Sequence, residues 1–226
     1  MWVMTNKGFI SVVADKNNPD NVLVRARAAG HIAAIVGSAW ANHVVETPMA
    51  DYRYRASVPR GCIASVMAGQ PDGIMIPKAT GPEQLRMFSA ELYETEQRNG
   101  VQPNATRIMP MAGETAKAAL NISAYADEEL PRLAALTWGS EDLANALGAS
   151  RKHDGDGQWT DLFRMIRAQI LLAAHAAGAA PVDTVHPDFR DLKTLKARAE
   201  SSFADGFAGM LAIHPDQVPV SNTACT

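Results

Sequence analysis

The chain has 226 residues, of which 47% are hydrophobic and 20% charged, and its formal net charge is −3 at pH 7. This length and composition are typical of a globular protein with a substantial core. They give no reason to expect binding to nucleic acid or to an anionic membrane surface, and no apolar run approaches the ~20 residues of a membrane-spanning helix. Cys62 and Cys225 lack metal-ligand spacing and the start lacks a signal-peptide pattern, so we expect a cytoplasmic protein with reduced thiols.

Residues 1–61 predict a small α+β unit of unknown role. Gly8–Ala14 and Val22–Ala28 flank a dense turn cluster, a pattern that indicates two antiparallel strands. Gly30–His43 has helical spacing, and Asp51–Ser57 alternates tyrosine with arginine. The predicted order is therefore ββαβ, and we place a domain boundary after residue 61.

Residues 62–226 predict a second domain in which strands alternate with helices. Such alternation is typical of an α/β fold with a parallel sheet and right-handed crossovers. The expected strands are Asp72–Lys78, Arg107–Met111, the apolar run ending at Trp138, Pro181–Asp183 and Met210–Ile213. The expected helices run from Thr80 to Gly100, from Glu114 to Leu120, from Leu143 to Leu147, from Leu162 to Ala174 and from Leu192 to Phe203.

The stretch Leu136–Leu143 shows most clearly where reactive groups could gather. Its apolar run stops at Gly139, and Glu141 and Asp142 follow before a helical pattern begins. Buried parallel strands have continuous apolar sequences of this kind, so the two carboxylates are expected in the loop after the strand. The alternative is that Asp142 or Glu141 only caps the helix.

Four of the five expected strands close with a potentially reactive group, and the fifth brings an aspartate. The groups are Lys78, Glu114, Asp142, His214 and Asp183. Because the carboxyl ends of parallel strands lie on one rim, these side chains are expected to converge. Each also has a plainer interpretation, as a solvated charge, a helix-start acid or a packed histidine.

Six ordered segments between about residues 69 and 222 resemble a known family. They are Pro71–Lys78, Gly113–Ala116, Leu136–Ala149, Trp159–Asp161, Val182–Asp191 and Ala212–Val218. In order and spacing they are similar to the citrate lyase beta-subunit-like CoA-ester lyases of the HpcH/HpaI aldolase superfamily. The resemblance implies a TIM-type (β/α) barrel, of which about five β/α units are present here.

The resemblance also implies a Mg²⁺ site formed by one glutamate and one aspartate, which by motif fall on Glu114 and Asp142. Mg²⁺ keeps several waters and needs only one or two protein carboxylates. It would polarise the substrate carbonyl while a carbon–carbon bond breaks or forms. Lys78 and His214 are then expected as further catalytic groups on the rim, and Asp183 as a cofactor contact.

The sequence also departs from the family pattern. The first three β/α units of the barrel, which carry a substrate-gripping arginine and much of the CoA surface, are not recognisable before Asp72. A partial barrel exposes strand edges and interior apolar surface. We therefore expect a homo-oligomer, or an N-terminal unit that covers the open edge.

The function expected from the resemblance is Mg²⁺-dependent carbon–carbon lyase chemistry of the aldolase or Claisen type. The substrate would be a short acyl-CoA or a 2-oxo acid, and the missing units would weaken turnover. Two alternatives stay open, an acyl-CoA thioesterase on the same scaffold and a non-catalytic interaction protein.

Overall fold

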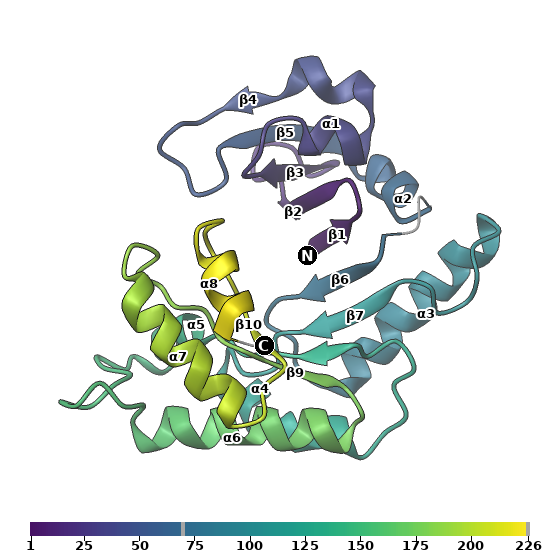
Figure 1. Ribbon diagram of the computed structural model, residues 1–226. Helices are drawn as coiled ribbons and strands as arrows, with labels where there is room; N and C mark the ends of the chain where they lie inside the picture. The colour runs from purple at the N-terminus through teal and green to yellow at the C-terminus, as the bar shows by residue number, and fades with distance from the viewer. Residues whose placement is uncertain (69–70, 225–226) are drawn as a thin grey trace. The chain divides into compact units, whose positions relative to one another are not determined.

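A computed structural model describes residues 1–68 and 71–224, and it shows a mixed α/β chain that divides into two compact units (Figure 1). Unit 1 comprises Met1–Ile76 and Met87–Ile108, and unit 2 comprises Pro77–Arg86 and Met109–Thr226. The domain boundary expected after residue 61 stays a prediction. Cys62 is a free thiol. Cys225 lies outside the described residues, and so does Gly69, near which the family-like segments begin.

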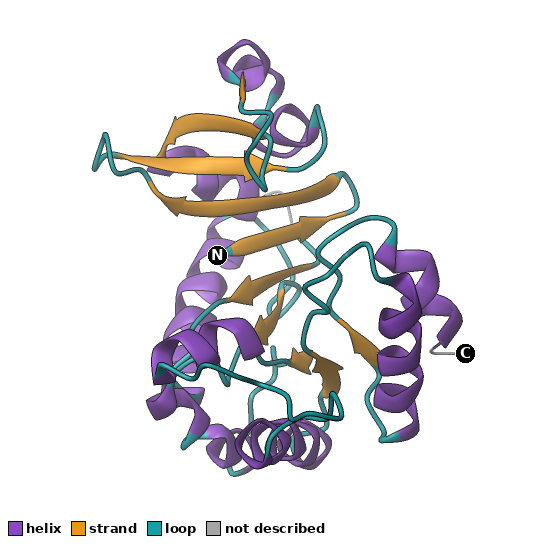
Figure 2. Ribbon diagram, turned by 90° about the vertical axis from the view of Figure 1, so that its left-hand side faces the viewer, coloured by secondary structure: helices purple, strands orange, loops and turns teal. Residues whose placement is uncertain are grey.

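Unit 1 is organised on a seven-stranded sheet with the strand order β4-β5-β3-β2-β1-β6-β7 (Figure 2). The strands are β1 (Trp2–Thr5), β2 (Gly8–Ala14), β3 (Asn21–Ala26), β4 (Val45–Glu46), β5 (Tyr54–Pro59), β6 (Gly73–Ile76) and β7 (Arg107–Pro110). The last two residues of β7 already belong to unit 2. The helices that contribute to unit 1 are α1 (His31–Val36), η1 (Ser38–His43), α2 (Arg60–Ala68) and α3 (Pro82–Arg98), whose first turn lies in unit 2.

The hairpin predicted near the N-terminus is confirmed. β2 pairs antiparallel with β3 in a register that sets Val12 opposite Val24. The alternating residues of β3 are buried at Val22, Val24 and Ala26, as the two-residue period of a strand requires. Helix α1 contacts β2 and β3, and its Ile32 is buried.

The single helix predicted from Gly30 to His43 is wrong. Helix α1 ends after Val36, and a separate 3-10 helix, η1, covers Ser38–His43. Gly37 lies between them with φ of 122°, a left-handed conformation that interrupts an α-helix and that glycine adopts with little strain.

Strand β1 was not predicted, and it covers one edge of the sheet that we expected to be open. It pairs antiparallel with β2 on one side and with β6 on the other, where Trp2 lies opposite Met75. The strand edge that we expected to be exposed at β6 is therefore covered by the N-terminal strand. A four-residue strand has too few alternations to be recognised by its pattern.

Unit 2 contains three of the five strands predicted from the sequence, whereas the other two, β6 and β7, belong to the seven-stranded sheet, in which β6 pairs antiparallel with β1. Its sheet has the order β10-β9-β8, with both pairs parallel. The strands are β8 (Ala135–Leu136), β9 (Ala180–Asp183) and β10 (Gly209–Met210). A parallel bridge from Met111 to Thr137 sets the residue after β7 beside the residue after β8. The ends of β7 and β8 are thus neighbours.

The helices of unit 2 flank these strands. They are α4 (Ala116–Ala119), η2 (Ile122–Ala126), α5 (Ser140–Leu147), α6 (Asp161–Ala176), α7 (Leu192–Ala204) and α8 (Gln217–Ala224). Helix α6 buries Phe163, Ile166 and Ile170, residues spaced three and four apart on one face. In the part of the chain that the structure describes, no helix combines the length and apolar character needed to cross a membrane.

Candidate active site

Glu114 lies just after β7, where backbone contacts fix the chain before a helix begins. The amide of Ala112 donates to the carbonyl of Thr137, which joins the ends of β7 and β8. Thr115 then caps α4 by accepting a hydrogen bond from the amide of Ala118 at 3.2 Å. The Glu114 residue is only 2% exposed, so its carboxyl group is held inside the unit by rigid neighbours.

Asp142 reaches the same place from the end of β8. It belongs to the first turn of α5, whose N-cap residue is Gly139 and has no side-chain cap. The alternative that Asp142 or Glu141 caps this helix is therefore wrong. Glu141 forms an ion pair with Lys152 instead. The Asp142 side chain is 48% exposed and remains available for other interactions.

Lys78 completes a three-residue cluster with Glu114 and Asp142, and all three belong to unit 2. Its backbone amide donates a hydrogen bond to Oε2 of Glu114. Its Nζ lies 3.2 Å from Oδ1 of Asp142. The structure thus brings together three of the five side chains that the sequence predicted for the rim.

The backbone of Lys78 has an uncommon conformation. Its φ is 53°, which costs a non-glycine residue free energy and persists only where the surroundings hold it. The next amide, of Ala79, donates to the carbonyl of Met111 at 3.2 Å. Hydrogen bonds of two successive amides, from Lys78 to Glu114 and from Ala79 to Met111, thus hold the backbone at this position.

The pKa of Glu114 is raised to about 7. Burial is the main cause, because it disfavours the charged form. The amide of Lys78 opposes this effect, while the charge and hydrogen bond of Asp142 add to it. Two carboxyl groups this close disfavour each other's ionisation, so the second one loses its proton only at a higher pH. Lys78 compensates for only part of this charge.

Gly139 provides the space that Glu114 occupies. A Cβ atom at position 139 would lie 2.8 Å from both Cγ and Oε1 of Glu114. Cβ atoms essentially never approach other atoms this closely, so any side chain at position 139 would displace the Glu114 carboxyl group. Packing therefore explains the glycine at this position.

The donor set fits a hard divalent cation. Carboxylate oxygens are the preferred ligands of Mg²⁺, which typically takes one or two of them and completes its shell with water and substrate. Among residues 1–68 and 71–224, no group of three or more His, Cys, Asp or Glu side chains could hold a metal ion. A cation at Glu114 and Asp142 would depend on such external ligands.

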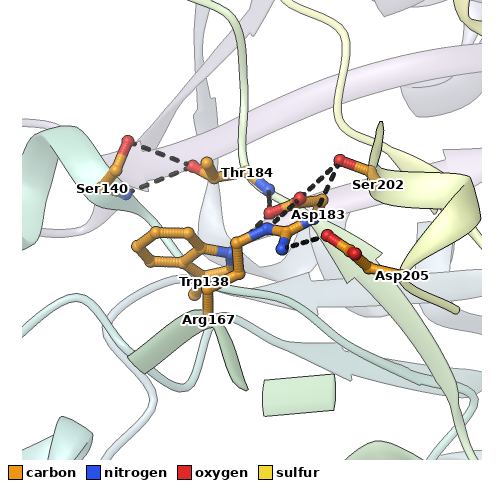
Figure 3. Close-up of polar contacts among 7 residues, drawn as sticks. All are labelled: Trp138, Ser140, Arg167, Asp183, Thr184, Ser202 and Asp205. Carbon is orange, nitrogen blue, oxygen red and sulfur yellow. Dashed lines mark hydrogen bonds and ion pairs between the residues drawn. The ribbon is translucent and has the colours of Figure 1, made fainter. Parts of the chain in front are cut away.

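Asp183 lies at the end of β9 but is engaged by four protein donors (Figure 3). Its Oδ1 accepts from Nε1 of Trp138 and from the amide of Thr184, each at 2.8 Å. Its Oδ2 accepts from Nε of Arg167 at 2.7 Å and from Oγ of Ser202 at 2.6 Å. The role of Asp183 as a cofactor contact stays a prediction, and its four bonds give it a structural task.

His214 contacts its own loop and the segment that follows β9. Its ring stacks on Phe189 with centroids 4.5 Å apart. Its Nδ1 accepts the amide of Asp216 at 3.3 Å, so the neutral ring carries its proton on Nε2. The side chain is 38% exposed. The structure thus leaves His214 open to solvent but gives it no contact with the three-residue cluster.

Several residues that shape this region could not be recognised from sequence patterns. Trp138 is fully buried, and Arg167 and Ser202 come from α6 and α7. A charged residue within an amphipathic helix is expected at its solvated face, so only the three-dimensional contact reveals the partner of Arg167. A cavity of about 500 Å³ lies beside them, between α6, α7 and the loop at His153–Trp159, and the three-residue cluster does not line it.

A sequence model of the HpcH/HpaI aldolase/citrate lyase family matches residues 12–215 of the chain. The match begins well before residue 69, where the motif resemblance starts. It therefore includes most of the N-terminal segment that we expected to stand outside the family pattern.

Individual proteins and structures show the same similarity. A citrate lyase subunit beta-like protein of Mycobacterium tuberculosis is 42% identical over 89 residues, which are 39% of this chain and 33% of that protein. Mitochondrial citramalyl-CoA lyase of Mus musculus is 32% identical over 158 residues, 66% of this chain and 44% of that protein. A crystal structure of M. tuberculosis CitE in complex with magnesium and acetoacetate has a TM-score of 0.60 and 29% identity, covering 74% of this chain and 63% of that one. The chain spans less than half the length of these two curated relatives.

Proposed function

Because the chain belongs to the HpcH/HpaI aldolase/citrate lyase family, we propose that it is a Mg²⁺-dependent carbon–carbon lyase that acts on a short acyl-CoA or a 2-oxo acid. The observation that supports this most directly is the buried carboxyl group of Glu114 beside Asp142 and Lys78. The proposed setting is a cytoplasmic protein with a partial (β/α) barrel.

Glu114 and Asp142 would hold the Mg²⁺ ion. When bound, the ion supplies positive charge that polarises a substrate carbonyl and stabilises an enolate. A cation would also reduce the repulsion between the two carboxylates and so favour the ionised form of Glu114. Ligand carboxyl groups must lose their protons on metal binding, so occupancy is expected to increase as the pH rises through the Glu114 pKa of about 7.

Lys78 and His214 are the groups that we propose for substrate contact and proton transfer. The Lys78 ammonium lies 3.2 Å from Oδ1 of Asp142. A cation between the carboxylates would take over this charge balance, which frees the ammonium to bind a substrate carboxylate. His214 lies in the loop after β10. Its Nε2–H would donate a hydrogen bond to the substrate, and in the other tautomer, with the proton on Nδ1, Nε2 would accept a substrate proton.

We propose that turnover is weaker than in complete family members. Positioning of the substrate can account for roughly 7–11 kcal/mol of a barrier, and a bidentate arginine–carboxylate contact is an effective way to position it. Strands β2, β3 and β5 pair antiparallel and so differ from the parallel β/α units in which that arginine is expected. The metal pair alone would supply only several kcal/mol.

The test is a turnover screen with malyl-, citramalyl- and citryl-type thioesters, each with and without Mg²⁺. We expect slow, Mg²⁺-dependent formation of an acyl-CoA and a 2-oxo acid, which Asp142→Asn abolishes and Glu141→Gln preserves. Release of free CoA without a 2-oxo acid would point to thioester hydrolysis. No product from any thioester, although Mg²⁺ binds, would contradict the lyase assignment.

A further inference from the structure

The polar cluster around Asp183 links the interior of unit 2 to the segment that carries Asp142 (Figure 3). Asp183 is 2% exposed, and its two oxygens accept four hydrogen bonds. A buried carboxylate with an ion-pair partner and no unfilled acceptor is fixed in orientation. It can therefore fix the positions of the residues that donate hydrogen bonds to it.

Two of its four donors fix the end of β8. The fully buried indole of Trp138 donates to Oδ1 of Asp183 at 2.8 Å. The amide of Thr184 donates to the same oxygen, and Oγ1 of Thr184 in turn accepts from the amide of Ser140 at 3.2 Å. Trp138 and Ser140 are thus both held from β9, on either side of Gly139.

Gly139 and Asp142 are the parts of this segment that face the candidate metal pair. Gly139 lies against the side chain of Glu114, where an added Cβ would lie 2.8 Å from Cγ and Oε1. Asp142 follows Ser140 by two residues in the first turn of α5. A small shift of Trp138 or Ser140 would therefore move both carboxyl groups relative to each other.

We infer that Asp183 is a positioning residue for the Glu114–Asp142 pair, acting through Trp138 and through Thr184. The inference rests on the proposed function for its metal, although the contacts of Asp183 do not. Arg167 supports the anchor from the other side, since it also bonds Asp205 at 2.7 Å. The surroundings that orient metal ligands typically change metal affinity by about 10–100-fold when they are altered.

The test compares Asp183→Asn with Asp205→Asn, which removes a charge from the same cluster but touches only Arg167. The Mg²⁺ affinity is measured by calorimetry, the Trp138 indole N–H by nitrogen-15 NMR, and amide exchange of Ser140 and Thr184 by hydrogen–deuterium exchange. The indole signal of Trp138 is assigned with Trp138→Phe, because the chain has four tryptophans.

In Asp183→Asn we expect a loss of Mg²⁺ affinity of about 10–100-fold, a shifted Trp138 signal and faster exchange at Ser140. Asp205→Asn should leave all three readouts near wild type. The inference is overturned if both variants behave alike or if Asp183→Asn changes neither the indole signal nor the exchange. If wild-type protein binds no Mg²⁺, the proposed metal site fails, while the indole signal and the exchange still decide whether Asp183 fixes this segment.

Should Asp183→Asn fail to fold, Trp138→Phe provides the second test. It removes one donor to Asp183 and keeps an aromatic ring in the buried site. We expect it to weaken Mg²⁺ binding by a smaller factor and to speed exchange at Ser140. Unchanged values for both would contradict the inference.

Discussion

Glu114 shows how one buried side chain can prepare a site for a cation. Its pKa of about 7 lies above the ordinary value of 4.5, with burial as the main cause and the charge of Asp142 as a contributor. The folded protein thus binds a proton that the unfolded chain has released in this pH range. The carboxyl group is most useful as a ligand when this proton leaves.

This pKa predicts how stability depends on pH. The proton that folded Glu114 retains stabilises the folded state. This contribution to the unfolding free energy is fully present below pH 4.5 and is lost as the pH rises through about 7. It amounts to at most about 3 kcal/mol. Urea unfolding without Mg²⁺ should therefore show that the gain in unfolding free energy of Glu114→Gln over wild type is larger at pH 8 than at pH 5. Asp161→Asn, at a fully exposed side chain, is the control. Equal pH dependence in wild type and Glu114→Gln would refute the raised pKa.

Gly139 offers a steric test of the same site. In Gly139→Ala the new methyl group would lie 2.8 Å from Glu114 Cγ, so the carboxyl group must move. We expect a loss of about 1–3 kcal/mol of unfolding free energy together with weaker Mg²⁺ binding. Gly155→Ala, where nothing lies within 4 Å, is the matched control. A Gly139→Ala protein that binds Mg²⁺ like wild type would show that Glu114 has no fixed position.

At the scale of elements, the connection between α3 and β7 depends on one buried acid. Glu96 is 1% exposed and accepts from the amides of Asn104 and Thr106 at 2.9 and 3.1 Å. It thus satisfies backbone groups of a loop that has few regular partners.

Loss of this acid should destabilise unit 1. Hydrogen bonds to a charged group contribute about 1.5–3 kcal/mol each, so Glu96→Ala should lower the unfolding free energy by roughly 3 kcal/mol or more, and Glu96→Gln by less. The comparison is Glu94→Ala, on an exposed ion pair with Arg98, which should change stability little. Chemical denaturation measures the unfolding free energy of each variant. Equal losses in Glu96→Ala and Glu94→Ala would show that the hydrogen bonds of Glu96 do not stabilise the unit.

The predictable elements were those with strong local patterns. The alternation around Val24 and the three-and-four spacing of Phe163, Ile166 and Ile170 were sufficient to predict β3 and α6. The break at Gly37 was missed because a single glycine in a helical pattern is often tolerated. Strand β1 was missed because four residues contain too few alternations to be recognised, although the strand pairs with both β2 and β6.

The site was predictable to the same extent. Lys78, Glu114 and Asp142 follow apolar runs, and parallel pairing brings such positions together. The surroundings of Asp183 were not predictable, because Arg167 and Ser202 reach it from two helices. Sequence spacing shows which residues end a strand but cannot show which of them are already bonded.

At the scale of the whole molecule, apolar side chains on α6 are left exposed. Leu162, Met165 and Leu172 are 41%, 46% and 70% exposed, and their spacing sets them on one stripe of the helix. Because β1 covers the edge of β6, we expect this stripe to be a surface for self-association.

We therefore predict a homo-oligomer that depends on α6. Light scattering should give a mass above that of one chain, and Leu172→Lys should lower it, because a charge on an apolar interface is costly to bury. Leu120→Lys, at another exposed leucine outside α6, should not. A wild-type protein that is monomeric at high concentration would contradict this prediction.

The central claim, that Glu114 and Asp142 together hold Mg²⁺, is tested most directly by calorimetric titration of the purified chain at pH 8. We expect one Mg²⁺ ion per chain, with affinity lowered by at least about 100-fold in Glu114→Gln and in Asp142→Asn and unchanged in Glu141→Gln. Binding that survives in the double variant, or no binding in the folded wild-type protein, would contradict it.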